Sequence, residues 1–121
     1  MFVLYGDTPL HEQSHGQSFL ALASNRFGGE GIFVLDEPEA ALSVSGCLAL
    51  LSIIARAAAA GAQFLIATHS PILLACPGAR IYELDDRGLA PCAYDDLDAV
   101  RLTRGFLAAP ERYVNAVLRE D

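Results

Sequence analysis

The sequence predicts an α/β fold with a parallel sheet flanked by helices, in a single domain covering residues 1–121. Residues 32–35 and 64–67 are short apolar runs bounded by glycine or polar residues, as expected of strands buried on both faces. Residues 45–60, between them, form a nearly all-apolar stretch of helical length. Strand, helix and strand with short links make a βαβ unit, which implies parallel strands and a right-handed crossover.

The remaining segments add helices and a hairpin. A helix is predicted at residues 14–27, where Ser14 provides the N-cap and two glycines follow the last turn. Near the other end, an Asp-Asp-Arg-Gly turn at residues 85–88 separates two strand-like runs, which predicts a hairpin. The hairpin strands are expected at residues 80–84 and 89–94, and two terminal helices at residues 96–107 and 111–119.

The charge and the cysteine content argue against several classes of protein. The net charge is −7 and all eight basic residues are arginines, so the chain repels phosphate backbones and direct nucleic-acid binding is not expected. The three cysteines are odd in number and lack C-x-x-C pairing, which predicts reduced thiols and a cytoplasmic location. The longest apolar stretch, residues 47–60, is shorter than the roughly 20 residues of a membrane span. The N-terminus also lacks the basic start of a secretory signal.

Polar side chains directly follow both predicted strands. Asp36 and Glu37 end the first strand, and Thr68, His69 and Ser70 end the second. In parallel sheets ligands bind beyond the carboxyl ends of the strands, so we expect these side chains to converge on one rim. An apolar strand leading into paired carboxylates suits metal-assisted phosphoryl chemistry, in which one carboxylate holds Mg²⁺ and the other polarises a water for in-line attack.

Three segments resemble motifs of one enzyme family. Residues 32–39, Ile-Phe-Val-Leu-Asp-Glu-Pro-Glu, resemble the Walker B segment of ABC-type (SMC/RecF-like) P-loop ATPases. Residues 67–71, Ala-Thr-His-Ser-Pro, resemble their switch segment, and residues 13–17, Gln-Ser-His-Gly-Gln, are similar to their signature motif. The three motifs follow the order of the family and span most of residues 12–71. The tail, including residues 70–74, 77–82 and 110–113, further resembles that of small uncharacterised prokaryotic AAA-type predicted ATPases.

The resemblance implies ATP and Mg²⁺ as ligands and ATP hydrolysis as the activity. It assigns Asp36 to the magnesium ion, Glu37 to the catalytic base and His69 to the γ-phosphate. The start of the predicted first helix suits phosphate binding as well, because freed backbone N–H groups bind anions. At this helix start the resemblance assigns nucleotide binding to Ser14, Gly16 and Gln17. They would act on a nucleotide that the opposite subunit holds.

The chain departs from the family pattern in several places. The signature segment has Gln13 where leucine is usual and His15 where glycine is usual. The loop after the Walker B segment carries Ser43 where many ABC ATPases have aspartate. A larger departure is that the sequence contains no G-x-x-x-x-G-K-[ST] loop and no lysine. We therefore expect a truncated three-layer P-loop NTPase-like sheet, with the Walker A half missing, that binds ATP poorly alone and works as a homodimer or with a P-loop-containing partner.

Other interpretations stay open. The Asp-Glu-Pro sequence alone is compatible with a simple turn, and a single histidine is compatible with a structural hydrogen bond. The chain is alternatively a catalytically inactive ATPase-like interaction module that associates through exposed apolar surface. A further alternative is a zinc metallopeptidase, because His11-Glu12-x-x-His15 matches H-E-x-x-H. Pro9 and Gly16 flank this match and oppose the helix that such a site needs.

Overall fold

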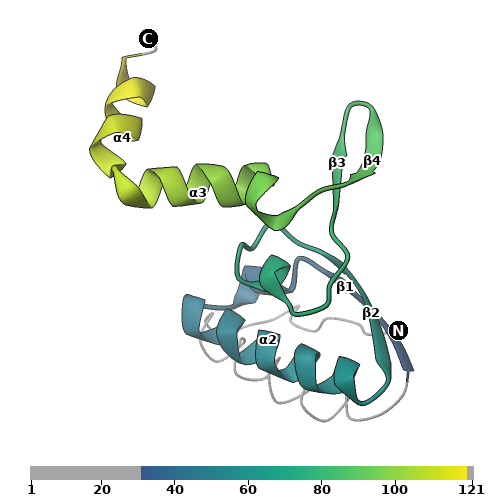
Figure 1. The fold of residues 1–121 in the computed structure, drawn as a ribbon. Coiled ribbons are helices and arrows are strands. Elements are labelled where there is room, and N and C mark those ends of the chain that lie inside the picture. Colours follow the sequence, from purple (N-terminus) through teal and green to yellow (C-terminus); the bar gives the residue numbers. More distant parts are fainter. Residues whose placement is uncertain (1–30, 120–121) are drawn as a thin grey trace. The chain divides into compact units, whose positions relative to one another are not determined.

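The computed structural model describes residues 31–119, which fall into two compact units divided between Ala79 and Arg80. The helix predicted at residues 14–27 lies outside the described residues, and the single domain stays a prediction. The described elements of the first unit are β1 (Gly31–Asp36), η1 (Pro38–Ala41), α2 (Val44–Ala59), β2 (Ala62–Ala67) and η2 (Leu73–Ala75) (Figure 1).

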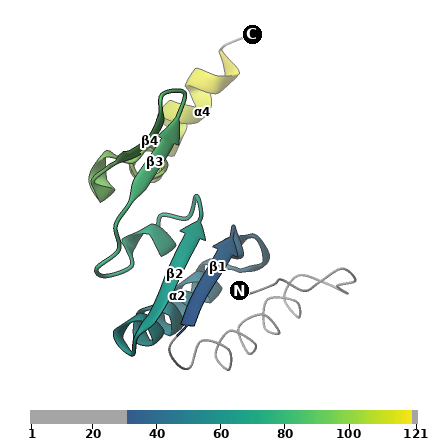
Figure 2. The same ribbon diagram turned by 90° about the vertical axis from the view of Figure 1, so that its right-hand side faces the viewer.

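The strands β1 and β2 are parallel neighbours, and α2 connects them. Their register pairs Gly31 with Ala62 and Asp36 with Ala67, so the two strands end at the same edge. Figure 2 shows the two arrows side by side and pointing the same way. The βαβ unit that the sequence predicts is therefore confirmed, with each of its boundaries shifted by two residues or fewer.

The core of the first unit lies between α2 and one face of this sheet. Leu50 and Ile54 are one helical turn apart on α2, and Leu50 is 0% exposed. On the sheet, the rings of Phe33 and Phe64 stack with their centroids 5.4 Å apart and pack against this core. The buried members of the cluster are Leu35, Leu50, Ile54, Ala57, Ala62 and Leu73.

The opposite face of the two strands is exposed in the described part of the chain. Exposure alternates along each strand, and Ile32 and Leu65 are 66% and 68% exposed. The prediction of strands buried on both faces is therefore wrong for residues 31–119, because the periodicity of a short apolar run does not reveal which face is covered. What these residues form is a mixed α/β arrangement with a two-stranded parallel sheet.

Local chemistry sets the ends of α2. Ser43 is its N-cap, and the Ser43 hydroxyl accepts a 3.1 Å hydrogen bond from the backbone N–H of Gly46. After Ala60, Gly61 adopts a φ of 113°, which suits glycine and turns the chain out of the helix. The helix is thus bounded so that β2 begins directly after it.

The second unit combines a hairpin with two helices. Its elements are β3 (Tyr82–Asp85), β4 (Gly88–Pro91), η3 (Tyr94–Asp96), α3 (Asp98–Ala108) and α4 (Pro110–Leu118). The antiparallel strands β3 and β4 meet at a turn in which the Asp85 carboxylate accepts from the Arg87 N–H at 2.8 Å. The predicted hairpin and terminal helices are confirmed.

Every helix within residues 31–119 is too short or too polar to span a bilayer.

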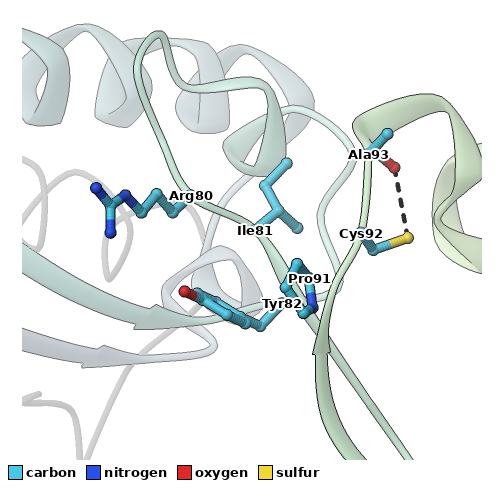
Figure 3. A pocket seen from close by; sticks show the side chains of 6 residues that line it. All are labelled: Arg80, Ile81, Tyr82, Pro91, Cys92 and Ala93. Atoms are coloured by element: carbon cyan, nitrogen blue, oxygen red, sulfur yellow. Dashed lines mark hydrogen bonds between the residues drawn. The ribbon is translucent and has the colours of Figure 1, made fainter.

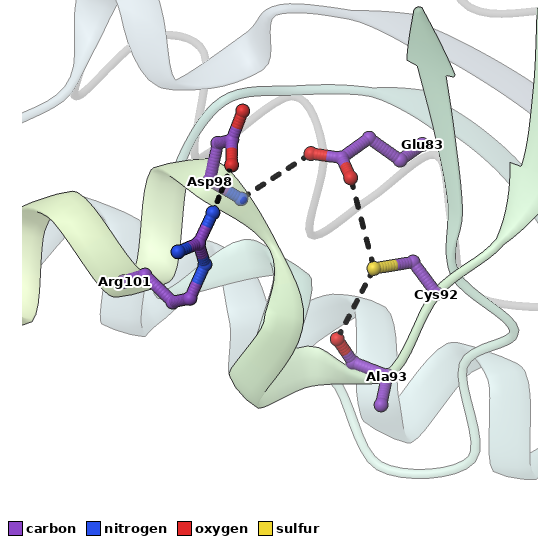
Figure 4. A network of polar contacts seen from close by, with 5 residues as sticks. All are labelled: Glu83, Cys92, Ala93, Asp98 and Arg101. Atoms are coloured by element: carbon purple, nitrogen blue, oxygen red, sulfur yellow. Dashed lines mark hydrogen bonds and ion pairs between the residues drawn. The ribbon is translucent and has the colours of Figure 1, made fainter.

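A polar network links this hairpin to α3 (Figure 4). The N-cap of α3, Leu97, has no side-chain acceptor, and an oxygen of Glu83 instead accepts from the backbone N–H of Asp98 at 3.2 Å. The other Glu83 oxygen lies 3.7 Å from the sulfur of Cys92, and Asp98 pairs with Arg101 at 2.5 Å. Strand β3 therefore supplies the acceptor that the first turn of α3 lacks.

Candidate functional site

The candidate site lies at the edge where β1 and β2 both end. The backbone N–H of Glu37 donates to the carbonyl oxygen of Ala67 at 2.7 Å, which extends the strand pairing one residue beyond Asp36. The segments that follow the two strands therefore leave the sheet side by side. Asp36 ends β1, the segment after it carries Glu37, and the segment after β2 carries His69, as expected for the carboxyl ends of parallel strands.

Glu37 has an unusual backbone conformation. Its φ of 47° and ψ of 54° are left-handed, and within residues 31–119 no other non-glycine residue has a positive φ. This conformation costs a residue with a Cβ about 1 kcal/mol or more. The next residue, Pro38, is buried and begins η1, where its fixed φ suits the first helical position. The chain therefore turns sharply from β1 into η1 at Glu37.

The turn brings the Glu37 carboxylate close to the His69 imidazole. The Oε2 atom of Glu37 lies 3.8 Å from the Nδ1 atom of His69, and the two side chains are 55% and 83% exposed. Because water screens such exposed groups, their direct attraction contributes little to stability. Exposure also leaves both groups accessible to a ligand. A carboxylate and an imidazole at this separation can polarise a water and contact an anion at one position.

Glu39 is the residue at this edge that the sequence interpretation missed. One of its oxygens accepts a 2.6 Å hydrogen bond from the Thr68 hydroxyl, and the other accepts a 3.0 Å bond from the backbone N–H of His69. The carboxylate therefore joins the segment after β1 to the segment after β2. A signal was available in the sequence, since a third acidic residue stands two positions after Glu37. Its partners, however, depend on the strand pairing.

Ser70 has a structural position beneath this rim. Its side chain is buried, and its hydroxyl accepts from the backbone N–H groups of Ile72 and Leu73, each at 3.2 Å. These bonds begin the turn that contains η2. Ser70 also affects the nearby Cys47 thiol. Burial raises the pKa of that thiol, and the negative charge of Glu39 raises it further. A hydrogen bond with Ser70 lowers it in part. Ser70 therefore fixes the loop after His69.

The described residues of the rim do not form a metal cage by themselves. Within residues 31–119, no three histidine, cysteine, aspartate or glutamate side chains are grouped so as to hold a metal ion. Asp36 is exposed at the end of β1 and offers a single carboxylate. That donor set fits Mg²⁺, which in phosphate-transferring sites binds one or two carboxylates and takes its other ligands from water and substrate phosphates.

The second unit carries an open hollow of about 510 Å³ (Figure 3). Its lining consists of Arg80, Ile81, Tyr82, Pro91, Cys92 and Ala93. Partial burial raises the pKa of the Cys92 thiol, and the carboxylate of Glu83 raises it further. A thiol with a raised pKa is a poor nucleophile near neutral pH because the thiolate is the reactive form.

The remaining residues that the sequence singles out precede the described part of the chain. They are the signature residues Ser14, Gly16 and Gln17 and the zinc-type residues His11, Glu12 and His15. The functional interpretation therefore depends on Asp36, Glu37, Glu39 and the segment from Thr68 onward. The chain matches no family model, no curated protein and no solved structure.

Proposed function

We propose that this chain supplies the Walker B and switch-histidine segments of an ATP-hydrolysing, ABC-type (SMC/RecF-like) P-loop ATPase. One observation carries the proposal. The strands β1 and β2 are parallel neighbours whose register pairs Asp36 with Ala67, so that Glu37 and His69 approach to 3.8 Å beyond their carboxyl ends. Two motifs that resemble one family thus meet at the edge where a nucleotide would bind.

In this proposal each side chain at the rim has one task. Asp36 would hold Mg²⁺, and the ion would neutralise charge on the phosphates. Glu37 accepts a hydrogen bond from the attacking water and orients it for in-line attack. His69 contacts the γ-phosphate. Residues that would act on a nucleotide held by an opposite subunit are Ser14, Gly16 and Gln17.

The electrostatics of the rim explain why a partner is part of the proposal. Asp36, Glu37 and Glu39 bring three carboxylates to the exit of β1, in a chain with a net charge of −7 and no lysine. Such a rim repels a polyphosphate until cations neutralise it. The P-loop, with its lysine and its ring of backbone N–H groups, has that role in P-loop NTPases. We therefore propose that a P-loop-containing portion outside these 121 residues completes the site.

The exposed face of the β1–β2 sheet supports the same proposal. Ile32, Val34 and Leu65 expose aliphatic side chains on that face, opposite to the face that α2 covers. Two-stranded sheets with one apolar face uncovered favour association with further strands or helices. A three-layer P-loop NTPase-like sheet, completed by the partner portion or by a second copy of this chain, would cover it.

Magnetic resonance titration of the isolated chain with Mg²⁺–ATP tests the proposal. We expect weak, millimolar binding, with shifts confined to the backbone amides of residues 36–39 and 68–70 and dependent on Mg²⁺. Asp36→Asn is expected to remove the Mg²⁺ dependence, and Asp86→Asn in the hairpin turn serves as the matched control. Shifts that are absent from both segments, or that appear only in the hairpin, would overturn the proposal. Micromolar affinity would overturn the need for a partner.

A second candidate is a catalytically inactive interaction module that uses the same apolar face. The absence of any lysine from the sequence and the exposure of Ile32 and Leu65 favour it. Sedimentation measurements distinguish the two candidates. A stable homodimer that shows no response to Mg²⁺–ATP, together with dissociation after Leu65→Asp, would support the module over the ATPase.

A further inference from the structure

We propose that Glu39 is a positioning residue that sets the separation between Glu37 and His69. The Glu39 carboxylate accepts from the Thr68 hydroxyl at 2.6 Å and from the backbone N–H of His69 at 3.0 Å. Glu39 itself stands two residues after Glu37, in the first turn of η1. It therefore connects the segment that carries the carboxylate to the segment that carries the imidazole.

The backbone pairing of the two segments ends at the hydrogen bond from the Glu37 N–H to the Ala67 carbonyl, so the parts of the pair beyond it need a further connection. The side chains of Glu37 and His69 are both largely exposed, so their mutual attraction is too weak to hold two loops together. Hydrogen bonds that end on a carboxylate are roughly twice as strong as bonds between neutral groups. Glu39 and Thr68 are also less exposed than Glu37 and His69, so water competes less with their hydrogen bond. The Glu39 bonds are therefore the better candidates for fixing the geometry.

The Thr68 hydroxyl extends this connection towards the core. It donates to Glu39 and accepts from the backbone N–H of Ser70 at 3.0 Å. Ser70 in turn accepts from the N–H of Leu73, which belongs to the buried cluster. A continuous set of hydrogen bonds thus runs from the core to Glu39. The position of His69 is fixed relative to the sheet and not merely to a loop.

The two bonds require a carboxylate at position 39. A carboxylate accepts on both oxygens, and here each oxygen has its own donor. Glutamine has the same length but one acceptor oxygen, so Glu39→Gln can keep only one of the two bonds as they stand. A hydroxyl is required in the same way at position 68, because this group must donate and accept at once. Thr68→Ser preserves the hydrogen bond to Glu39 and the hydrogen bond from the Ser70 N–H, and Thr68→Val removes both of these bonds.

Magnetic resonance of the full chain without nucleotide tests the proposal. In the native protein we expect a nuclear Overhauser contact between the Glu37 side chain and the His69 ring. Glu39→Ala is expected to abolish it and to speed hydrogen exchange of the His69 amide at least about fivefold, because a charge-assisted bond is lost. Exchange of the Leu65 amide within β2 is expected to stay unchanged. Glu111→Ala, which removes an exposed glutamate of α4, is the charge-matched control.

Graded variants keep the test decisive if Glu39→Ala unfolds the chain. Glu39→Gln and Thr68→Val are expected to weaken the contact between Glu37 and His69. Thr68→Ser is expected to keep it. An undiminished contact in Glu39→Gln and Thr68→Val would overturn the proposal. Because no nucleotide is present, that failure is distinct from failure of the proposed ATPase function.

The catalytic consequence rests on the proposed function. In the assembly with the P-loop-containing portion, a mispositioned Glu37 and His69 slow the chemical step more than they weaken nucleotide binding. We expect Glu39→Gln to lower kcat about tenfold or more and to leave KM for ATP nearly unchanged. A rise in KM with an unchanged kcat would contradict the positioning role.

Discussion

The Nδ1 atom of His69 lies 3.8 Å from the Oε2 atom of Glu37, although the two residues belong to segments on either side of α2. The parallel pairing of β1 and β2 produces this proximity, because it brings Asp36 and Ala67 to the same edge. The Glu39 carboxylate then reaches across to the segment after β2.

Removing the carboxylate of Glu37 is expected to stop hydrolysis without stopping nucleotide binding. In the proposed assembly with a P-loop-containing portion, Glu37→Gln should lower kcat for ATP hydrolysis by about 10²- to 10⁴-fold, the usual contribution of a positioned base. Binding of ATP should be kept or strengthened, since the amide removes a negative charge near the phosphates. Steady-state hydrolysis and equilibrium nucleotide binding measure the two effects separately. Glu111→Gln is the control, and equal activity of the two variants would contradict the role of Glu37.

Replacing Glu37 with glycine is expected to stabilise the fold. Its φ of 47° is unfavourable for a side chain with a Cβ and is readily adopted by glycine. The strain energy that glycine relieves is larger than the conformational entropy that it adds to the unfolded chain. We therefore expect a gain of about 0.5–1 kcal/mol in the free energy of unfolding. Glu37→Val should instead destabilise, because a β-branched residue is least tolerant of positive φ. Urea unfolding measures both variants, and a loss of stability in Glu37→Gly would show that no strain is stored there.

The sequence was sufficient to predict the elements of the βαβ unit and the placement of Glu37 and His69 on one rim. Apolar runs ending in polar residues indicated both strands, and the helical length between them required a parallel crossover. The helix expected at residues 45–60 is observed as Val44–Ala59, so each end lies within one residue of the prediction. These features are local in the chain, which is why pattern alone reveals them.

What the sequence could not predict depends on contacts between distant segments. Ile32 and Leu65 are apolar like their neighbours, so nothing in the pattern distinguished the exposed face from the face that packs on α2. Glu39 is one of several acidic residues in the sequence. Its hydrogen bonds appear only after β1 and β2 pair, which brings the Thr68 hydroxyl to 2.6 Å from its Oε1 atom. The left-handed backbone of Glu37 is likewise a product of tertiary packing, because propensity favours glycine or asparagine there.

Truncation of Leu50 is expected to be the most damaging change on α2. Its side chain is 0% exposed in the cluster with Leu35 and Ile54, so Leu50→Ala leaves a cavity and should cost about 2–5 kcal/mol of unfolding free energy. Leu48 lies on the same helix but is 54% exposed, and Leu48→Ala should cost less than about 1 kcal/mol. Urea unfolding of the pair compares the same chemical change in two environments. Similar losses would mean that α2 does not bury the Leu50 face in solution.

Stability is expected to fall at alkaline pH because of Cys47. Burial raises the pKa of this thiol above its ordinary value of 9.0, so the folded state keeps a proton that the unfolded state releases. The contribution of the Cys47 thiol to the free energy of unfolding is therefore fully present below about pH 9. It is lost as the pH rises through that value and above. Cys47→Ala should flatten the fall in unfolding free energy between about pH 8 and about pH 10. The pKa values of Cys76 and Cys92 are also raised, so a smaller slope should remain until both of these residues are replaced too.

Glu83 is expected to control the reactivity of Cys92. Partial burial raises the pKa of this thiol, and the Glu83 carboxylate, 3.7 Å from the sulfur, raises it further because a negative charge disfavours the thiolate. Glu83→Gln keeps the shape of the side chain but removes the charge, so the thiolate fraction and the rate of reaction with a thiol reagent near pH 8 should rise.

That rate should be measured after Cys47→Ala and Cys76→Ala, so that only one thiol reacts. Hydrogen exchange of the Asp98 amide adds a second measurement, because Glu83 also accepts its N–H at the start of α3. Glu83→Ala should speed that exchange, whereas Glu83→Gln, whose amide oxygen still accepts, should have a smaller effect. Glu111→Gln and Glu111→Ala should change neither quantity. If Glu83→Gln left the thiol rate unchanged while Glu83→Ala raised it, the carboxylate would act by covering the sulfur and not through its charge.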